Sequence, residues 1–249
     1  MSRKWVLVTG GAKRLGRAVC VTLAERGWNV VTHYHASRDD AEETLAAARA
    51  AGAKAVGAFY DLGAGAEALI TIATRAAGAP IHALVNCAAV FDHDALEAVN
   101  AASFERHMRL NALAPSQLMS AFARELPEGE RGAVVNFLDF KLAAPYPDHY
   151  SYTLSKYALA GATELAARAL APRVRVNAVA PGYVLPAPGQ SEEDFARLHD
   201  NTPLARGAHA EDVSEAVAFL LANEAVTGQT IYVDAGLRFA APDRDFMFQ

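Results

Sequence analysis

A tyrosine and a lysine four residues apart, Tyr152 and Lys156, are the residues of this sequence that point most directly to chemistry. If residues 150–171 are helical, both side chains lie on one face, because positions i and i+4 are neighbours on a helix. An ammonium group beside a phenol favours the phenolate and lowers the pKa of the tyrosine toward neutrality. Such a tyrosine can act as a general acid or base. The pair also occurs by chance, so its meaning depends on the rest of the chain.

A glycine-rich turn, TGGAKRLG at residues 9–16, lies between the first predicted strand and the first predicted helix. Glycine permits a tight turn and a close approach of the backbone to a pyrophosphate. The N-terminus of the helix adds free N–H groups and the positive end of its dipole. An ordinary turn between a strand and a helix also carries glycine. The position in the first βαβ unit favours the phosphate-binding interpretation.

The residues that follow the second predicted strand, 29–34, are basic or carry a hydroxyl: His35, Ser37 and Arg38. A carboxylate for the ribose 2′-hydroxyl, which an NAD-selective site would place here, is missing from this stretch. Arg14 stands where many dinucleotide turns have glycine, and its guanidinium suits contact with a phosphate. These residues predict NADPH/NADP+ as the cofactor. The alternative is that His35 and Arg38 are merely solvated at the start of a helix.

Asp61, at the end of the third predicted strand, has two possible roles. It could accept a hydrogen bond from the adenine amino group, or it could cap the helix that follows. The complete set of predicted cofactor contacts is Gly10, Lys13, Arg14, Leu15, Gly16, His35, Ser37, Arg38, Asp61, Leu62, Asn86, Ala88, Lys156, Pro181 and Gly182.

Short apolar runs alternate with amphipathic stretches along the whole chain, and this pattern predicts βαβ units around a parallel sheet. The predicted strands are 5–8, 29–34, 55–59, 83–85, 133–138, 174–179 and 230–233, and the predicted helices are 15–26, 39–51, 67–77, 103–126, 150–171 and 213–221. The strands are almost continuously apolar, as a sheet with helices on both faces requires. The fold class is therefore a doubly wound α/β sheet, which binds ligands at the carboxyl ends of its strands.

The chain is predicted to be a single domain over residues 1–249, since no low-complexity linker divides it. Within it, residues 186–200 are expected to form a substrate loop and helix, and residues 238–249 a C-terminal tail with several aromatic side chains. That tail is too apolar for an idle terminus, so it is expected to dock on a neighbouring subunit or to be disordered.

The composition excludes several classes of protein. With 28 acidic and 23 basic residues among 249, the net charge is −5, which does not suit a nucleic-acid partner. The apolar fraction of 52% excludes disorder, and two cysteines exclude a disulfide scaffold. The eight histidines do not fall at metal-ligand spacings, so no metal is expected. No apolar run is long enough for a membrane helix, and no signal peptide is evident, so a cytoplasmic location and a small-molecule substrate are expected.

Several motifs in fixed order resemble the short-chain dehydrogenase/reductase family: the glycine-rich turn, Asn86, Asn111, Tyr152-x-x-x-Lys156 and Pro181-Gly182. The resemblance runs from Val6 to about Gly236. It implies a Rossmann-type sheet of seven strands and hydride transfer from a nicotinamide. It also implies that Tyr152 donates the proton, that Lys156 holds the nicotinamide ribose, and that Asn111 positions a water. A homotetramer built on helices 103–126 and 150–171 is implied as well.

Two departures from the common pattern resemble the pteridine reductase branch of that family. Asp139 replaces the usual serine thirteen residues before Tyr152, and Arg14 replaces a glycine. In that branch an aromatic residue after the fourth strand sandwiches a flat pterin against the nicotinamide, and Phe91 stands at this point. The implied catalytic residues are Asp139, Tyr152, Lys156 and Asn111, and the implied substrate contacts are Phe91, Asp139, Tyr152 and Tyr183.

The pteridine interpretation leaves alternatives open. Asp139 could be a helix cap or a surface carboxylate, and Phe91 could pack in the core. Asp92, His93 and Asp94 are expected to be solvated loop residues. The main alternative function is a carbonyl reductase of the same family, acting on a 3-oxoacyl thioester or a ketone. A non-catalytic NADP-binding sensor is the alternative from another class.

Overall fold

The computed structural model describes residues 3–186, 190–240 and 244 of the chain. Seven strands form one sheet in the order β3-β2-β1-β4-β5-β6-β7, and every neighbouring pair is parallel. The strands are β1 (Trp5–Thr9), β2 (Asn29–Tyr34), β3 (Ala55–Phe59), β4 (Ile81–Asn86), β5 (Gly132–Phe137), β6 (Val174–Pro181) and β7 (Thr230–Val233). The doubly wound, Rossmann-type sheet predicted from the sequence is thus confirmed.

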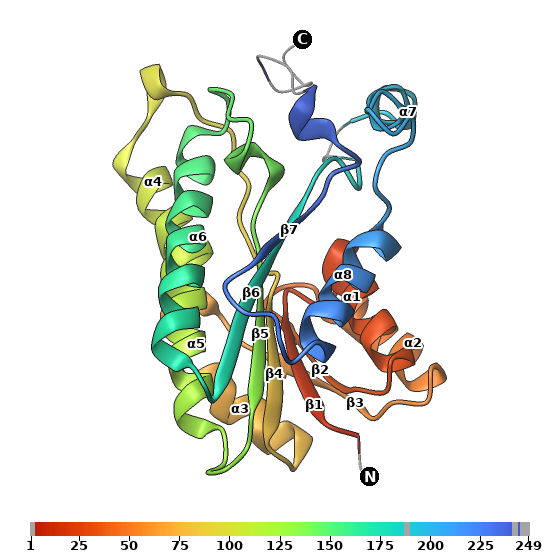
Figure 1. The fold of residues 1–249 in the computed structure, drawn as a ribbon, viewed down its shortest axis with the longest axis vertical. Helices are drawn as coiled ribbons and strands as arrows, with labels where there is room; N and C mark the ends of the chain where they lie inside the picture. The colour runs from red at the N-terminus through yellow and green to blue at the C-terminus, as the bar shows by residue number, and fades with distance from the viewer. Residues whose placement is uncertain (1–2, 187–189, 241–243, 245–249) are drawn as a thin grey trace.

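Helices cover both faces of this sheet, which Figure 1 shows edge-on between two helical layers. The α-helices are α1 (Arg14–Glu25), α2 (Arg38–Ala50), α3 (Ala68–Ala77), α4 (Ala101–Met108), α5 (Ala114–Glu125), α6 (Tyr150–Leu170), α7 (Glu192–Asp200) and α8 (Ala210–Ala222). Helices α1, α2 and α8 form one layer, and α3 to α6 form the other (Figure 1). The strand order reverses between β1 and β4, and a ligand crevice is expected at such a point.

The two largest apolar clusters form most of the core, one on each side of the sheet. Val6 and Val8 of β1 belong to the cluster under α1 and α8, whereas Trp5 and Leu7 belong to the cluster under α3 and α5. Successive side chains of a strand point to opposite faces, so one strand contributes to both clusters. Because Val6, Leu7 and Val8 are completely buried, the end of β1 is a rigid support for the turn that follows.

The single long helix predicted over residues 103–126 is divided in two. A turn of π-helix (η3, Arg109–Leu113) separates α4 from α5, and Pro115 stands in the first turn of α5. Proline has no N–H, so it cannot donate the usual helical bond to the carbonyl of Asn111. The widened turn is the physical consequence, and such turns are frequent at functional sites. Asn111 lies on this turn.

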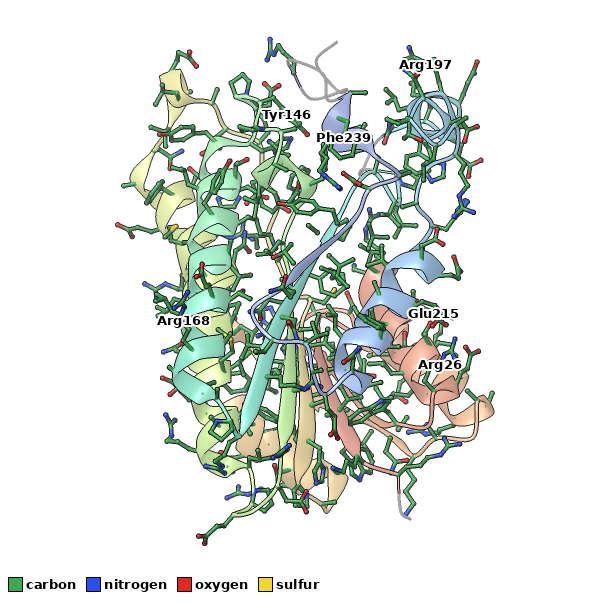
Figure 2. All side chains as sticks on the ribbon, viewed as in Figure 1. Arg26, Tyr146, Arg168, Arg197, Glu215 and Phe239 are labelled. Atoms are coloured by element: carbon green, nitrogen blue, oxygen red, sulfur yellow. The ribbon has the colours of Figure 1, made fainter. Side chains whose placement is uncertain are left out.

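Contacts between α1 and α8 join the N-terminal and C-terminal parts of the chain. Arg26 and Glu215 form an exposed ion pair at 2.7 Å, and Figure 2 shows these two side chains close together, Arg26 at the end of α1 and Glu215 in the middle of α8. Such surface pairs contribute about 0–1 kcal/mol. The Thr22 and Ser214 hydroxyls form a buried hydrogen bond of 2.8 Å between the same helices. Throughout the described ranges, no helix has the length and apolar character that crossing a membrane would require.

Candidate active site

A cavity of about 700 Å³ opens at the carboxyl ends of the strands, near the reversal of strand order. It is lined by most of the residues predicted from the sequence: Gly10, Lys13, Arg14, Leu15, Gly16, His35, Asp61, Leu62, Ala88, Phe91, Asp139, Tyr152, Lys156, Pro181, Gly182 and Tyr183. Four predicted residues, all within the described part of the chain, do not line it: Ser37, Arg38, Asn86 and Asn111. The chain therefore brings most of the predicted cofactor residues and all of the predicted substrate residues into one continuous space.

The turn after β1 has the shape of a phosphate cradle, because two of its glycines leave no room for a side chain. A Cβ on Gly16 would lie 2.1 Å from the carbonyl oxygen of Gly10. Gly10 itself has φ +63°, and a Cβ there would lie 2.9 Å from the Cα of Ala88. Helix α1 starts within this glycine-rich stretch, at Arg14, so Gly16 lies in its first turn, where the N–H groups have no partner within the helix. This backbone fits the pyrophosphate of a dinucleotide.

Arg14 lines the cavity and also makes a contact that the sequence does not predict. Its Nη2 donates to the carbonyl of Pro186 at 2.8 Å, which ties the phosphate turn to the start of the predicted substrate loop. Arg14 also has φ +54°, an uncommon conformation for a residue with a side chain. Asp61 lines the cavity, and its Oδ1 accepts from the N–H of Gly63 at 2.8 Å, so the geometry corresponds to the capping alternative.

His33 supports the turn from strand β2, although no sequence motif marks it as a site residue. The N–H of Gly10 donates to His33 Nδ1 at 3.1 Å, and His33 Nε2 donates to the carbonyl of Tyr60 at 3.1 Å. The ring must be neutral to accept one bond and donate the other. Burial lowers the pKa of His33 to about 4, which keeps it neutral.

This buried histidine predicts a loss of stability in acid. Between pH 6.5 and about 4 the unfolded chain binds a proton at His33 and the folded chain does not, so acidification favours unfolding. The free energy of unfolding should fall by up to about 3 kcal/mol across this window. Urea denaturation of the wild type and of His33→Gln, at about pH 7 and about pH 4.5, measures this loss. A glutamine amide can make both bonds without titrating, so an equal acid-induced loss in the variant would contradict the prediction.

The hydroxyl of Tyr152 donates to Asp139 Oδ2 at 2.8 Å, and this pair is the chemical centre of the cavity. The other carboxylate oxygen, Oδ1, accepts from the N–H of Lys141 at 2.9 Å. Burial raises the pKa of Asp139. Burial and the neighbouring carboxylate raise the pKa of Tyr152 well above its ordinary value, so the lowered pKa expected from Lys156 is wrong for this structure. The phenol remains protonated, and this is the form that can donate a proton.

Lys156 lies one helical turn after Tyr152 and is buried. Its Nζ donates to the carbonyl of Phe137 at 2.6 Å and lies 5.5 Å from the centre of the Tyr152 ring. Burial lowers the pKa of Lys156 to about 8, although the nearby Asp139 carboxylate opposes this effect. The ammonium is therefore held beside the phenol at neutral pH by the end of β5.

Asn111 holds the loop after β4 against the catalytic helix. Its Nδ2 donates to the carbonyl of Val90 at 2.9 Å and to Ser155 Oγ at 3.0 Å, and its Oδ1 accepts from the N–H of Val90 at 2.9 Å. The π-helical turn places this amide where it can reach both partners. The implied role of Asn111 in positioning a water stays a prediction.

Phe91 forms one wall of the cavity. Its ring is 45% exposed, so it does not pack in the core as the alternative interpretation had it. It stacks on His149 with ring centres 4.0 Å apart and planes inclined by 15°, and it meets Tyr152 edge-on at 4.6 Å. An exposed aromatic face beside the phenol offers a surface on which a flat ring can stack.

Aromatic residues also line the far end of the cavity. Tyr183 contacts Phe140 edge-on at 5.3 Å, and Lys141 Nζ lies 3.9 Å from the centre of the Tyr146 ring. Figure 2 labels Tyr146 between the top of α6 and the C-terminal part of the chain. Lys141 and Tyr146 line the cavity but were missed from the sequence, because neither belongs to a spaced motif.

Asp94 corrects a further expectation. The sequence predicts a solvated loop residue, but the side chain is only 6% exposed. Its Oδ1 accepts from the N–H of Ser151 at 2.9 Å, which explains the burial of a charged group. No local signal could have revealed this contact, since the two residues are 57 positions apart.

The C-terminal tail contacts its own chain where it is described. Arg244 pairs with Asp148 at 2.6 Å, and Arg238 pairs with the buried Asp234 at 2.9 Å. Phe239 is 76% exposed. The other apolar residues of the tail, Phe246, Met247 and Phe248, lie outside the described part of the chain. The expected docking of the tail on a neighbouring subunit therefore remains a prediction.

Known proteins share this architecture. Residues 10–238 match the family model described as "Enoyl-(Acyl carrier protein) reductase". The chain belongs to the short-chain dehydrogenase/reductase family. Among solved structures, the FolM alternative dihydrofolate reductase 1 of Brucella suis, in complex with NADP, is 37% identical, with 97% of each chain covered and a TM-score of 0.92.

Curated relatives of this reductase family align over most of the chain. An uncharacterized oxidoreductase of Methylorubrum extorquens is 33% identical over 94% of this chain and 98% of its own. The 3-oxoacyl-[acyl-carrier-protein] reductase FabG of Staphylococcus epidermidis is 29% identical over the same shares.

Proposed function

We propose that this protein is an NADPH-dependent short-chain reductase that transfers hydride to a C=N bond in a pterin or dihydropterin ring. The observation that carries the proposal is the grouping of Phe91, Tyr152 and Asp139 in one cavity, with a 2.8 Å hydrogen bond between the last two. The aromatic face suits a flat heteroaromatic ring, and the hydroxyl–carboxylate pair suits protonation of a ring nitrogen.

Reduction of a C=N bond requires a hydride at carbon and a proton at nitrogen. When bound, NADPH supplies the hydride. The raised pKa of Tyr152 keeps its phenol protonated, so the hydroxyl can give the proton to the nitrogen. The Asp139 carboxylate orients that hydroxyl through Oδ2, and the N–H of Lys141 fixes the carboxylate through Oδ1. A serine at position 139 could orient the phenol but could not hold a negative charge beside it.

The chain supplies the groups that would hold NADPH. The pyrophosphate would lie on the turn at Gly10 and on the N-terminus of α1, where no side chain intrudes. Lys13, Arg14 and His35 bring basic groups to the same end of the cavity, and they would pair with the 2′-phosphate. Lys156 would hold the nicotinamide ribose. The related FolM protein of Brucella suis was solved with NADP.

Replacing Arg14 with alanine should weaken NADPH binding about tenfold more than NADH binding, because a charge-assisted bond to the 2′-phosphate is lost. Arg17→Ala is a matched control: Arg17 stands on the same helix and pairs with Glu43 at 2.8 Å. Fluorescence titration of both cofactors against both variants measures the difference. An equal loss of NADPH and NADH affinity in Arg14→Ala would show that Arg14 acts through Pro186 alone.

A steady-state screen tests the proposed substrate class. NADPH oxidation is followed with a dihydrobiopterin-like pterin, dihydrofolate, an acetoacetyl thioester and a quinone. The dihydropterins should give values of kcat/KM at least about tenfold above the others, since only they use both the aromatic wall and the Asp139 carboxylate. A higher value for the thioester would refute the pterin assignment.

A carbonyl reductase is the second candidate, and the similarity to FabG favours it. The Tyr152–Lys156 pair could protonate a carbonyl oxygen as well as a nitrogen. Against it stand Asp139 in the serine position and the stacking surface of Phe91. A non-catalytic NADP-binding sensor is less well supported, since Tyr152 and Lys156 remain in reach of each other.

A homotetramer built on α4, α5 and α6 is part of the proposal. Two leucines, Leu113 and Leu165, are 52% and 69% exposed on this layer, and burying them against a second copy would be favourable. The adjoining groove between Phe104, Met108 and Ala158 could receive such side chains.

A further inference from the structure

The loop after β4 includes residues 90–94, which belong to no helix or strand and which we call the 90–94 segment. Its even-numbered residues are anchored. The backbone of Val90 makes two 2.9 Å bonds with Asn111, and the N–H of Asp92 donates to His107 Nε2 at 3.2 Å. The ring of Phe91 faces the cavity between these anchors. The position of the aromatic wall is therefore fixed by its two neighbours in the chain.

Asp94, the last residue of the 90–94 segment, makes three bonds to the first two residues of α6. Its carbonyl accepts from the N–H of Tyr150 at 3.2 Å, and its Oδ1 accepts from the N–H of Ser151 at 2.9 Å. Its Oδ2 accepts from the hydroxyl of Ser151. A carboxylate is well placed here, because it satisfies free N–H groups and lies at the positive end of the helix dipole.

His149, the residue before α6, does not cap the helix with its own side chain. His149 is in the left-handed conformation, with φ +57°, and its Nδ1 donates to the carbonyl of Asp92 at 3.2 Å. The helix that carries Tyr152 is thus capped by a side chain from a distant part of the sequence. Tyr152 is the residue directly after Ser151, so its hydroxyl depends on this first turn for its position.

The 90–94 segment therefore positions both groups that a flat substrate would meet. At position 91 it carries the aromatic wall, and at position 94 it holds the turn that carries the proton donor. The centres of the Phe91 and Tyr152 rings are 4.6 Å apart, and the rings meet edge-on. A flat ring must lie against Phe91 and still reach the Tyr152 hydroxyl, and misplacement of a reacting group by about 1 Å costs up to about 100-fold in rate.

We propose that Asp94 is a positioning residue that sets the spacing between Phe91 and Tyr152 for a flat heteroaromatic substrate. The inference rests on the proposed function for its choice of substrate. It assigns to Asp94 no contact with the substrate or with the reacting atoms. Loss of the carboxylate leaves the Ser151 N–H and hydroxyl unpaired, so the first turn of α6 loosens and Tyr152 departs from its place.

Two variants of Asp94 and one control variant test the proposal. Asp94→Ala should raise KM for a dihydropterin and lower kcat, each by about fivefold to tenfold, while the Kd of NADPH changes less than about twofold. Asp94→Asn should recover most of this loss, because the amide oxygen still accepts from the Ser151 N–H. The control is Asp212→Ala, which removes the carboxylate that accepts from the N–H of His209 at 2.8 Å at the start of α8. It should lower Tm without changing KM.

Crystal structures of the wild type and of Asp94→Ala measure the relative position of the Phe91 and Tyr152 rings directly, whichever substrate the enzyme prefers. The separation of the Phe91 and Tyr152 rings should increase from 4.6 Å, and the 2.8 Å bond from Tyr152 to Asp139 should lengthen. An unchanged ring separation together with unchanged KM and kcat would overturn the role of Asp94. If the wild type reduces no dihydropterin, the proposed function fails, and the ring separation still decides the role of Asp94.

Discussion

Replacing Tyr152 with phenylalanine should lower kcat by about 10²- to 10⁴-fold and leave the Kd of NADPH within about twofold. The substitution removes the hydroxyl that donates to Asp139 at 2.8 Å and keeps the ring that meets Phe91 edge-on. The cavity therefore retains its shape and loses its proton donor. Steady-state kinetics with a dihydropterin measure kcat, and quenching of NADPH fluorescence measures binding.

Tyr157→Phe is the control for this substitution. Tyr157 lies on the same helix, is 42% exposed, and donates to the carbonyl of Leu142 at 3.2 Å. Loss of this exposed hydroxyl should change kcat less than about twofold. If Tyr152→Phe retained turnover within about threefold of the wild type, another group would have to supply the proton, and Tyr152 would lose its assigned role.

Much of the fold follows from the sequence because the periodic pattern is strong. β2, β3 and β7 begin and end where the apolar runs predict, since turn-forming or polar residues bound each run. The ends of β1 and β6 were harder to predict. Thr9 and Pro181 continue these strands by pairing with Asn86 and Val233, although a glycine follows each of them and proline is a poor strand former. Partners in neighbouring strands decide such ends, and one sequence window does not contain them.

The residues around the cavity could be predicted because parallel sheets bring the carboxyl ends of their strands to one edge. Contacts between distant segments could not. Arg14 reaches Pro186 across 172 positions, and Asp94 reaches Ser151 across 57. These pairs depend on how the loops pack after the sheet has formed. The pKa of Tyr152 shows the same limit, because spacing reveals Lys156 but not the burial that outweighs it.

The π-helical turn at Asn111 is a place where the periodic sequence pattern does not predict the local structure. The spacing of apolar residues predicts one helix over residues 103–126, and the apolar residues before and after the turn fit that spacing. The missing N–H of Pro115 and the two bonds from Asn111 to Val90 instead favour a wider turn. A local break in the predicted element thus coincides with the side chain that ties the loop after β4 to the catalytic helix.

Asp139→Ser should change substrate preference. It is expected to lower kcat/KM for a dihydropterin by about 100-fold and for a simple ketone by less than about fivefold. The carboxylate accepts from the Tyr152 hydroxyl. In the proposed reaction it would place negative charge beside the ring nitrogen that receives the proton. A carbonyl oxygen needs only the phenol and an orienting hydroxyl, which serine supplies.

The pH profile gives this prediction a second readout. Burial raises the pKa of Asp139, so the ionised carboxylate is present above that raised value and is lost as the pH falls through it. The wild type should therefore lose kcat/KM for a dihydropterin at a higher pH than a carboxylate of ordinary pKa would predict, and Asp139→Ser should lack this acid limb. The alkaline limb should remain in both enzymes, because Lys156, with a pKa of about 8, loses its proton above that pH.

Asp139→Asn keeps the shape of the side chain without its charge, and it should behave like the serine variant. If instead the acid limb persisted in both variants, or the ketone and the dihydropterin lost activity equally, the proton would not pass through a site that Asp139 controls. The similarity to the reductases of acyl carrier protein substrates would then be the better guide to the reaction.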